Sequence, residues 1–395
     1  MRPNEPPPRL LLVANQAGDV LEYRLPLLDA LRRAAFEVHL AVPPEPAAAA
    51  LAEHGYPVHA IPLRRLNVGP RDELRTLAAL LRLYRSLRPA LVHHLCLKPV
   101  LHGGIAARLA RVPSTIGTLT GLGPIFTRRS PDMRALRPLV SAGLRFACAG
   151  ERHVLVVQNP SDRDRLVASR IARPDRTVVI GGSGVDPTLF TPRPEPEGPP
   201  AVLLACRLLR EKGVEDFVAA AGRLRAGGHS ARFVLSGEPV PEHPDSVPLA
   251  AIAALRDSGL LEWHGWSGDM PALFARSHIV CLPSYYGEGL PRVLLEAAAS
   301  GRPIVTTDTP GCRDVVRHGW NGLLVPARDP EALAGAIATL IEKPELRAVM
   351  GARGRAMVLA KFTLTRVIDE YVALHRAVIE APGAAAAASP GVIAR

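Results

Sequence analysis

Residues 9–42, "RLLLVANQAGDVLEYRLPLLDALRRAAFEVHLAV", contain the pattern that decides the fold. The apolar run from Leu10 to Ala14 predicts a buried strand, and a polar loop over 15–19 follows it. Leucines then recur at helical spacing from Leu21 to Leu31, and a second apolar run predicts another strand over 38–42. Strand, loop, helix and strand in this order are typical of a βαβ unit in a parallel sheet.

Residues 201–238, "AVLLACRLLREKGVEDFVAAAGRLRAGGHSARFVLSGE", repeat this pattern. They predict a strand to Cys206, a polar loop through Gly213, a helix, and a strand that ends near Ser236. A chain of 395 residues is also long for a single core. We therefore predict two doubly wound α/β domains with parallel sheets.

The stretch "PRPEPEGPP" at 192–200 separates the two halves and has the composition of a linker. This division predicts an N-terminal domain over 1–191 and a C-terminal domain over 201–365. We expect residues 366–380 to form a C-terminal helix that packs back toward the N-terminal domain. The Ala- and Pro-rich end, 381–395, is expected to be a disordered tail.

Composition limits the partners and the compartment. The net charge is +11, but aromatic residues make up only 4% and the arginines are dispersed, which argues against nucleic acid as a partner. A membrane surface and phosphorylated substrates would both use such charge, and both stay open. The five scattered cysteines fit a reducing cytoplasm. No apolar window is long enough to span a membrane, so we expect a cytoplasmic protein, with peripheral association at the inner face of the membrane left open.

Two common nucleotide-binding motifs are missing. Neither predicted domain carries G-x-G-x-x-G after its first strand, and the Gly-rich "GGSGVD" at 181–186 precedes no clear helix. A Walker motif does not occur either. Nicotinamide chemistry and P-loop chemistry are therefore disfavoured.

Residues 285–303, "YYGEGLPRVLLEAAASGRP", place two acids eight positions apart around a helix start. Pro291 suits the first helical position, and the backbone N–H groups of Gly289 and Leu290 would then favour a phosphate. Glu288 and Glu296 lie at most about 12 Å apart along the axis. We hypothesise that Glu288 accepts hydrogen bonds from a sugar and that Glu296 accepts them from a ribose.

A simpler interpretation is that one acid complements the helix dipole and the other is an ordinary exposed glutamate. Against it, Arg207 and Lys212 directly follow the strand at 201–206 and would supply cations for a departing diphosphate. These two cations could also be surface charges.

At this point the residues resemble a known family. "SYYGEGLPRVLLEAAASGRPIVTTDTPGCRDVV", "ACRLLREKGVEDFV", "GSGVD" and "GLLV" look like the retaining glycosyltransferases of family 4, whose E-x7-E motif is matched by Glu288 and Glu296. "LLVANQAGDVLEYRLPLLDAL", "KPVLHGGIAARLA" and "TLTGLGPIF" are similar to the branch that builds lipid-linked saccharides. The resemblance spans about residues 9–375 and implies the GT-B fold, in which two Rossmann-like domains face a central cleft. It also implies that the N-terminal domain is on the acceptor side and that the C-terminal domain binds the nucleotide sugar.

The resemblance also implies roles for single residues. Arg207 and Lys212 would bind the donor diphosphate and, with Glu288 at the transferred sugar, form the catalytic group. The substrate-binding residues would be Glu296 at the ribose, Gly289 and Leu290 through their amides, Gly18 in the first loop, Lys98 at an acceptor phosphate, and Thr120. Thr120 stands where many relatives carry a histidine, which puts a catalytic histidine in doubt. His93 and His94 could be structural residues or substrate contacts.

The implied chemistry retains the anomeric configuration without an amino-acid nucleophile bound to the sugar, and needs neither cofactor nor metal. "DRD" at Asp162–Asp164 mimics a metal-binding D-x-D motif, but after Asn159 it reads better as the acidic start of a helix.

The stretch "TRRSPDMRALRPLVSAGLRFA" at 127–147 spaces apolar residues at helical intervals. Arg134, Arg137 and Arg145 accompany them, and Pro138 is expected to kink the helix. The pattern suits an ordinary core helix with a solvated basic face. It also suits a lobe that meets anionic lipid.

We therefore predict a retaining hexosyltransferase of cell-surface polysaccharide synthesis. Its donor would be a nucleotide-diphosphate sugar, and its acceptor a saccharide, in our hypothesis one linked to polyprenyl diphosphate. The alternatives are a nucleotide-sugar epimerase or hydrolase on the same fold, and a non-catalytic binding subunit.

Overall fold

The computed structural model describes residues 6–63, 69–127 and 130–380. The chain divides into two compact units, which we call unit 1 (Met1–Ser183 with Arg366–Arg395) and unit 2 (Gly184–Thr365). The predicted tail at 381–395 lies outside the described residues.

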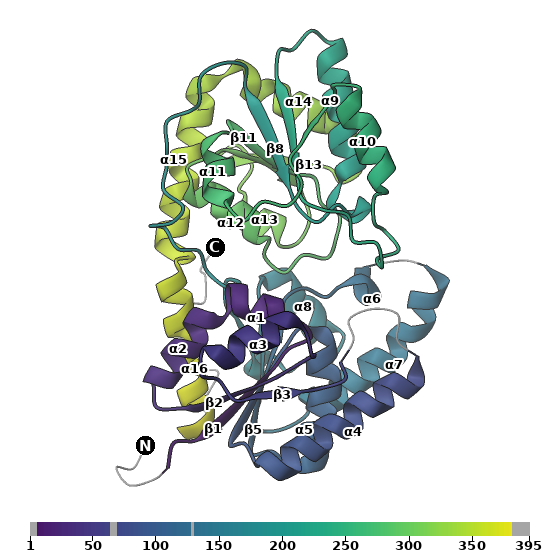
Figure 1. Ribbon diagram of the computed structural model, residues 1–395, viewed down its shortest axis with the longest axis vertical. Coiled ribbons are helices and arrows are strands. Elements are labelled where there is room, and N and C mark those ends of the chain that lie inside the picture. The colour runs from purple at the N-terminus through teal and green to yellow at the C-terminus, as the bar shows by residue number, and fades with distance from the viewer. Residues whose placement is uncertain (1–5, 64–68, 128–129, 381–395) are drawn as a thin grey trace. The chain divides into compact units, whose positions relative to one another are not determined.

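Unit 1 is built on a seven-stranded parallel sheet in the order β3-β2-β1-β4-β5-β6-β7 (Figure 1). Its strands are β1 (Arg9–Val13), β2 (Glu37–Val42), β3 (Val58–Ala60), β4 (Leu91–Leu95), β5 (Ser114–Leu119), β6 (His153–Val157) and β7 (Thr177–Val179). Its helices are α1 (Ala17–Tyr23), α2 (Leu25–Arg33), α3 (Pro46–Glu53), α4 (Pro70–Leu87), the π-helix η1 (Pro99–Gly103), α5 (Gly104–Ala110), α6 (Pro124–Thr127), α7 (Pro131–Cys148), α8 (Pro160–Ala168), the 3₁₀ turn η2 (Pro174–Arg176) and the C-terminal α16 (Leu364–Glu380).

Both faces of this sheet are covered, as its continuous apolar strands require. Side chains alternate between faces along a strand, so Leu10 and Leu12 of β1 pack with α2 and α16, whereas Leu11 and Val13 pack with α4 and α5. α16 is therefore a core element of unit 1.

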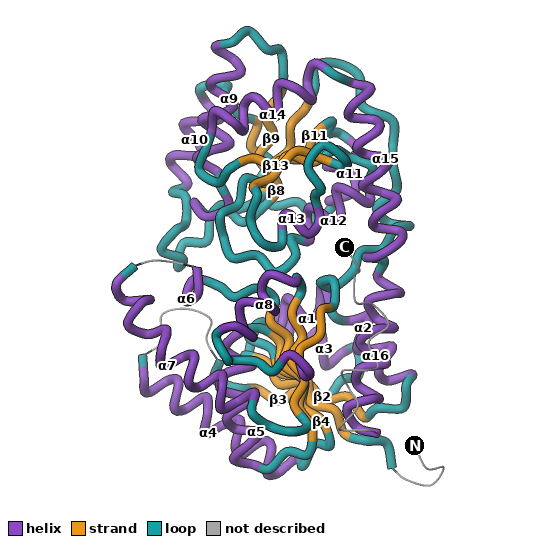
Figure 2. The backbone as a smooth tube through the Cα atoms, turned by 180° about the vertical axis from the view of Figure 1, so that it is seen from behind, coloured by secondary structure: helices purple, strands orange, loops and turns teal. Residues whose placement is uncertain are grey.

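Unit 2 contains a six-stranded parallel sheet in the order β10-β9-β8-β11-β12-β13. Its strands are β8 (Ala201–Ala205), β9 (Arg232–Ser236), β10 (Glu262–Trp263), β11 (Ile279–Leu282), β12 (Ile304–Thr307) and β13 (Gly322–Val325). Its helices are the 3₁₀ turn η3 (Arg210–Lys212), α9 (Val214–Ala226), α10 (Leu249–Asp257), α11 (Met270–Ala275), α12 (Arg292–Ala299), α13 (Cys312–Val315), α14 (Pro330–Glu342) and α15 (Pro344–Lys361). Figure 2 shows in each unit the strands enclosed by helices.

The first predicted helix is in fact two helices. α1 ends at Tyr23 and α2 begins at Leu25, with Arg24 between them. Pro26 is the reason, because proline lacks an N–H and cannot sit inside a continuous helix without losing a hydrogen bond. α1 also begins earlier than expected, at Ala17, whose N–H donates to the Glu45 carboxylate at 2.9 Å. Gly18 therefore lies in the first turn of α1, and the prediction that placed it in a loop is wrong.

The segment 192–200, predicted as a linker, contains no helix or strand and packs within unit 2. Glu195 forms a two-pronged ion pair with Arg347 of α15 at 2.7 and 2.8 Å. The carbonyl of Pro194 accepts a hydrogen bond from Arg302.

Each sheet has one point at which the strand order reverses. In unit 1 the chain winds outward from β1 to β2 and β3, then returns to place β4 on the other side of β1. In unit 2 the same reversal falls between β8 and β11. Ligands of open α/β sheets bind outside the carboxyl ends of the strands at such switch points. The loops after β1, β4, β8 and β11 are therefore the places to search for a site.

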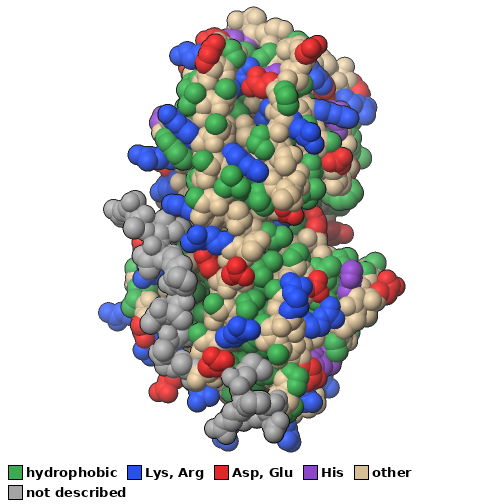
Figure 3. Space-filling view, turned by 90° about the vertical axis from the view of Figure 1, so that its left-hand side faces the viewer, with side chains coloured by type: hydrophobic (Ala, Val, Ile, Leu, Met, Phe, Trp, Pro, Cys, Tyr) green, Lys and Arg blue, Asp and Glu red, His purple; other side chains and the backbone are tan. Residues whose placement is uncertain are grey.

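The distribution of charge on the exposed surface does not point to a binding site. On the face drawn in Figure 3, Lys and Arg side chains are interspersed with Asp and Glu side chains and do not gather into one basic stripe. None of the helices in the described ranges is long and apolar enough to cross a membrane.

Candidate functional site

The switch point of unit 2 holds a nearly buried ion pair. Lys212 ends the turn after β8, and Glu288 lies in the loop after β11. The Lys212 ammonium donates to Oε1 of Glu288, and the two side chains are only 12% and 10% exposed. Two predicted site residues that are 76 positions apart therefore meet. Each therefore compensates the buried charge of the other.

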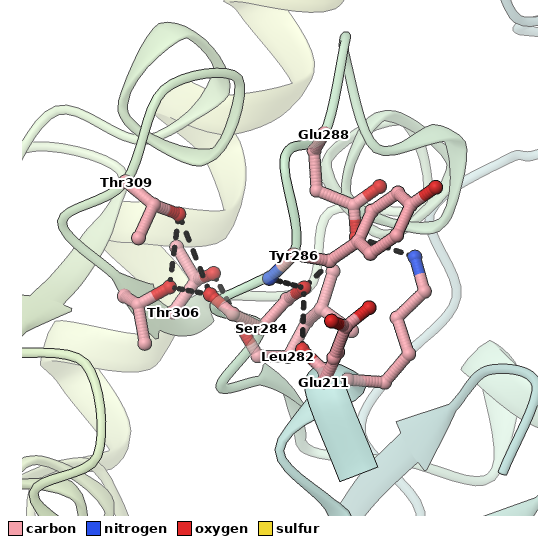
Figure 4. Close-up of polar contacts among 9 residues, drawn as sticks. Glu211, Leu282, Ser284, Tyr286, Glu288, Thr306 and Thr309 are labelled. Carbon is pink, nitrogen blue, oxygen red and sulfur yellow. Dashed lines mark hydrogen bonds and ion pairs between the residues drawn. The ribbon is translucent and has the colours of Figure 1, made fainter. Parts of the chain in front are cut away.

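Ser284, which sequence reasoning overlooked, holds Glu288 in place. Its hydroxyl lies 2.9 Å from Oε1 of Glu288 and 3.2 Å from the backbone oxygen of Glu211. One hydroxyl has one proton, and the shorter bond to a charged acceptor is the stronger. Figure 4 shows Ser284 between Glu211 and Glu288 on one side and threonines on the other. Thr307 at the end of β12 and Thr309 just after it both donate to the backbone oxygen of Ser284, so the neighbouring strand also holds this loop.

Glycines allow the loops to approach so closely. Gly213 has φ +79°, and a Cβ there would lie 2.2 Å from the backbone oxygen of Pro283. Gly311 has φ +82°, and a Cβ there would lie 2.9 Å from the backbone oxygen of Glu288. Both positions require a left-handed backbone and no side chain. The glycine after Lys212 was a readable signal, because only glycine adopts this conformation without cost.

Arg207 follows β8 beside the same pair. Its guanidinium makes no hydrogen bond or ion pair with any residue in the described part of the chain, and the side chain is half-buried. Burial raises the pKa of the neighbouring Cys206 thiol to about 12, with Lys212 and Arg207 acting in the opposite direction and Glu288 adding to the rise. The thiol therefore stays protonated near neutral pH and is a poor nucleophile.

Glu296 is buried inside α12 and already has a cationic partner. Arg292, one turn earlier, donates from Nε to Oε1 of Glu296 at 2.6 Å. The i, i+4 spacing of the two residues would have revealed this pair in the sequence. α12 begins at Arg292 with Pro291 as its N-cap, one residue later than predicted, and Gly289 and Leu290 are buried in the loop before it.

The switch point of unit 1 gathers two of the predicted acceptor-side residues. Lys98 lies after β4, and its ammonium donates to Glu73 of α4 at 2.9 Å. Thr120 follows the adjacent strand β5, and its Oγ1 lies 3.3 Å from the Cys96 thiol. Glu73 was not predicted, because no local pattern links it to Lys98.

His93 and His94 point into the core of unit 1 and are fully buried. His93 bonds His375 of α16 at 3.1 Å, and His94 bonds the hydroxyl of Tyr84 at 3.0 Å. Burial lowers the pKa of both rings, that of His94 to about 3. Of the two open interpretations, the structural one holds for both.

The D-x-D-like stretch is a helix start. The Asn159 side chain accepts from the N–H of Asp162 at 2.8 Å and so caps α8, and Asp162 is buried against it. Among the described residues, no group of three or more His, Cys, Asp or Glu is placed to hold a metal ion.

Comparison with known families covers both units. Residues 185–357 match the model of "Glycosyl transferases group 1", and residues 9–156 match "Glycosyl transferase 4-like". Each unit therefore matches a family of glycosyltransferases, and the chain is a glycosyltransferase.

Among relatives, the chain is 24% identical over 387 residues to N,N'-diacetylbacillosaminyl-diphospho-undecaprenol alpha-1,3-N-acetylgalactosaminyltransferase of Campylobacter jejuni, covering 94% of this chain and 99% of that one. It is 33% identical over 178 residues to alpha-D-kanosaminyltransferase of Streptomyces kanamyceticus, covering 45% of each chain.

Among solved structures, sucrose-phosphate synthase from Thermosynechococcus elongatus superposes with a TM-score of 0.78 at 20% identity, covering 94% of this chain and 100% of that one. Anabaena HepE in complex with UDP superposes with a TM-score of 0.72 at 20% identity, covering 92% and 98%. These two likenesses confirm the predicted fold.

Proposed function

We propose that this glycosyltransferase moves a sugar, with retention, from a nucleotide-diphosphate donor to a hydroxyl of a saccharide carried on a lipid diphosphate, in polysaccharide biosynthesis. The observation that carries the proposal is the group of Arg207, Lys212 and Glu288 at the switch point of unit 2. Two comparisons support it: a UDP complex is known for HepE, and the Campylobacter relative is named for a diphospho-undecaprenol-linked substrate.

Donor binding exchanges partners within the buried pair. In the structure Lys212 is neutralised by Glu288. A diphosphate offers Lys212 a more highly charged partner, and the hydroxyls of the donor sugar offer Glu288 hydrogen-bond donors in return. Both buried groups then remain paired, so the exchange avoids an uncompensated buried charge. Ser284 stays on the carboxylate and keeps it aimed.

Catalysis follows from where charge grows. As the bond between the anomeric carbon and the phosphate oxygen breaks, its electron pair stays on the diphosphate, and Lys212 and Arg207 stabilise this charge. The acceptor oxygen bonds to the same carbon, and its proton passes to an oxygen of the leaving phosphate. Because leaving group and acceptor use one face of the sugar, the configuration is retained. Glu296 and the paired Arg292 bind the ribose end of the nucleotide.

Incubation of the purified enzyme with a panel of nucleotide-diphosphate sugars, with and without a polyprenyl diphosphate-linked saccharide, tests the proposal. We expect donor consumption only when acceptor is present, and NMR of the product should show the anomeric configuration of the donor. Consumption of donor alone would identify a hydrolase or epimerase, and inversion would contradict the mechanism. Glu296→Ala should weaken binding of the bare nucleotide diphosphate roughly tenfold to a hundredfold, the loss expected for hydrogen bonds to a charged group.

We also propose that α7 brings the enzyme to an anionic membrane. Leu136, Leu139 and Phe146 are 44%, 70% and 44% exposed on this helix, and Arg134 of the same helix is exposed as well. Basic and apolar side chains together favour anionic lipid, as does the net charge of +11.

The structure changes which residues of the predicted membrane lobe can be tested. Arg137 and Arg145 donate to the backbone oxygens of Ile125 and Ser169, so they hold unit 1 together. α7 runs through Pro138 as one helix, and residues 128–129 of the predicted stretch lie outside the described residues.

In a flotation assay with phosphatidylglycerol liposomes at low salt, the enzyme should float with the liposomes. Leu136→Ser with Leu139→Ser should release it, because each buried leucine contributes about 1.5–3 kcal/mol. Leu249→Ser, an equally simple change at a 55% exposed leucine of unit 2, is the control. Retention of the double variant would place the membrane contact elsewhere.

A further inference from the structure

A second lysine–glutamate pair lies at the switch point of unit 1, joined by a histidine. The Lys98 ammonium donates to Oε1 of Glu73 at 2.9 Å, and Nε2 of His102 lies 3.0 Å from Oε2 of the same carboxylate. The three side chains are 26%, 30% and 14% exposed, so a solute can reach them. The donor-side mechanism uses none of them.

The local backbone is built to place this cluster at the carboxyl end of β4. Cys96, directly after the strand, has φ +73°, a left-handed conformation that costs about 1–2 kcal/mol in a residue with a side chain. The helix that follows starts as a π-helix, a rare form that is frequent at functional sites. Lys98 and His102 lie in this irregular segment, and both contact Glu73 of α4.

The hydrogen bonds of His102 decide the charge of the cluster. Its Nδ1 lies 3.1 Å from the backbone oxygen of Lys98, and a carbonyl only accepts, so Nδ1 carries a hydrogen. The contact between Nε2 and the Glu73 carboxylate then requires a second proton between ring and carboxyl group. Burial lowers the pKa of His102, and the Glu73 charge opposes that shift. Because burial lowers the pKa of His102, this second proton binds as pH falls, and with it the cluster holds one more positive than negative charge.

The Glu73 carboxylate therefore has two partners, Lys98 and His102. This allows Lys98 to exchange the carboxylate for another anion. If Lys98 turns to a solute anion, His102 still bonds the carboxylate, and no charge is left without a partner. Unit 2 shows the same arrangement, with Glu288 shared between Lys212 and Ser284. The chain has only four lysines, and two of them occupy the two switch points.

We propose that Lys98, Glu73 and His102 form a phosphate-binding site of unit 1 that takes the diphosphate of the acceptor, with Lys98 exchanging the Glu73 carboxylate for a phosphate oxygen. The identity of the acceptor rests on the proposed function, whereas the anion site rests on the geometry alone. Glu73 is a competitor for Lys98 in this arrangement, and His102 is the residue that keeps Glu73 bound during the exchange.

Pyrophosphate binding tests the site directly. In an Arg207→Ala/Lys212→Ala background the donor-side cations are absent, and calorimetry with inorganic pyrophosphate then reports unit 1. Adding Lys98→Gln should weaken the remaining binding about tenfold, as expected for a lost charged hydrogen bond. Adding Glu73→Gln should instead tighten it severalfold, because the competitor is gone. Lys361→Gln, at an exposed lysine of α15, is the control.

The opposite signs separate an anion site from a structural pair. A pair that merely holds η1 to α4 would give weaker binding in both variants, and this result would overturn the proposal. Unchanged binding in Lys98→Gln would overturn it as well.

Kinetics identify the source of the phosphate. With a polyprenyl diphosphate-linked saccharide, Lys98→Gln should raise the acceptor KM about tenfold and leave the donor KM unchanged. The same saccharide on a neutral alkyl chain should show no change in KM. A raised donor KM would assign the site to the donor and overturn the acceptor assignment. If the wild-type enzyme transfers no sugar at all, the proposed function fails, while the pyrophosphate result still judges the site.

Discussion

The two units carry the same electrostatic device in different surroundings. At each switch point a lysine after one strand is neutralised by a glutamate with a second holder: Glu288 by Lys212 and Ser284 in unit 2, Glu73 by Lys98 and a histidine in unit 1. The unit 2 pair is almost buried, whereas the unit 1 pair is about a quarter exposed. Desolvation strengthens every charge interaction, so the buried pair suits a step in which charge develops, and the open pair suits binding and release.

The cores of the two units also differ in how many histidines they bury. Unit 1 buries several histidines, among them His93, His94, His153 and His375, all at or below 2% exposure. Among the described residues of unit 2, only His278 is comparably buried. Unit 1 therefore depends on neutral imidazoles in its interior, and unit 2 does so far less.

The largest predicted effect is that acid unfolds unit 1 before unit 2. His375 donates from Nδ1 to the Tyr371 carbonyl, so its Nε2 accepts the Nδ1 hydrogen of His93, and His93 accepts from Thr118. A proton on Nε2 of His375 would face another N–H, with the Arg24 cation also acting on His93. Burial lowers the pKa of His375 to about 4.

The direction of the pH effect follows from the number of protons that the folded and the unfolded states bind. An unfolded histidine has a pKa near 6.5, so the unfolded state binds more protons as pH falls below that value. Stability of unit 1 is complete above about pH 6.5 and is lost as pH falls toward 4, by about 3 kcal/mol for His375 alone. The three tryptophans, Trp263, Trp266 and Trp320, all lie in unit 2. Circular dichroism should therefore change at a higher pH than tryptophan fluorescence.

His375→Gln should move the circular-dichroism midpoint to lower pH, because the amide keeps a hydrogen-bonding group but does not titrate. His264→Gln, at an exposed histidine of unit 2, is the control. Coincident transitions by both probes would contradict the contrast between the cores.

The second prediction concerns the cations of unit 2. Arg207→Ala or Lys212→Ala should lower turnover on the order of a hundredfold, the effect of removing one donor from a developing charge. Lys98→Gln in unit 1 should leave kcat nearly unchanged, since an exposed pair that only binds acts on KM. Steady-state kinetics on the three variants checks this. Near-normal turnover in both unit 2 variants would end the phosphate assignment.

The local pattern of the sequence was sufficient for the sheets, and it singled out Lys212 and Glu288, which the structure brings into contact. Apolar runs predict β1 and β8, and the glycines and charges that follow predict the loops after them. Contacts between distant residues could not be predicted. The pairing of Lys212 with Glu288 spans 76 positions, and that of His93 with His375 spans 282, so no spacing rule connects them. Only the assembled sheet brings them together.

The start of α1 was predicted too late for the same reason, because Glu45 accepts the Ala17 hydrogen bond from the loop after β2. By contrast, the split at Pro26 and the pairing of Arg292 with Glu296 were local and readable. The polar residues around Gly18 predict a loop there. They do not show which group accepts hydrogen bonds from the first N–H groups of the helix.

A third prediction tests how closely the loops of unit 2 must approach. Gly213→Ala should destabilise unit 2 by about 2 kcal/mol, because alanine at φ +79° is strained and its Cβ would meet a backbone oxygen. Gly222→Ala in α9 is the matched control: a Cβ there meets nothing within 4 Å, and the change should stabilise the helix by about 0.5–1 kcal/mol. Urea unfolding followed by tryptophan fluorescence measures both. Equal effects would show that the turn tolerates a shift.

The smallest predicted effect tests whether the Lys212–Glu288 and Lys98–Glu73 pairs work in the same way. Glu288→Gln removes the charge that pairs with Lys212 while keeping a side chain that can still bond Ser284. A bare nucleotide diphosphate has no sugar for Glu288 to bind, so it should bind this variant no worse than wild type, and about threefold more tightly if Glu288 competes for Lys212. Transfer should fall, because the contact to the sugar is weakened in the transition state. Glu73→Gln should act on pyrophosphate in the same direction, but less strongly at high salt, since salt screens exposed charges more than buried ones. Calorimetry at low and high salt measures both. If Glu288→Gln loses the nucleotide, the carboxylate is a support for the loop rather than a partner that yields to the donor, and the likeness between the two switch points ends at their geometry.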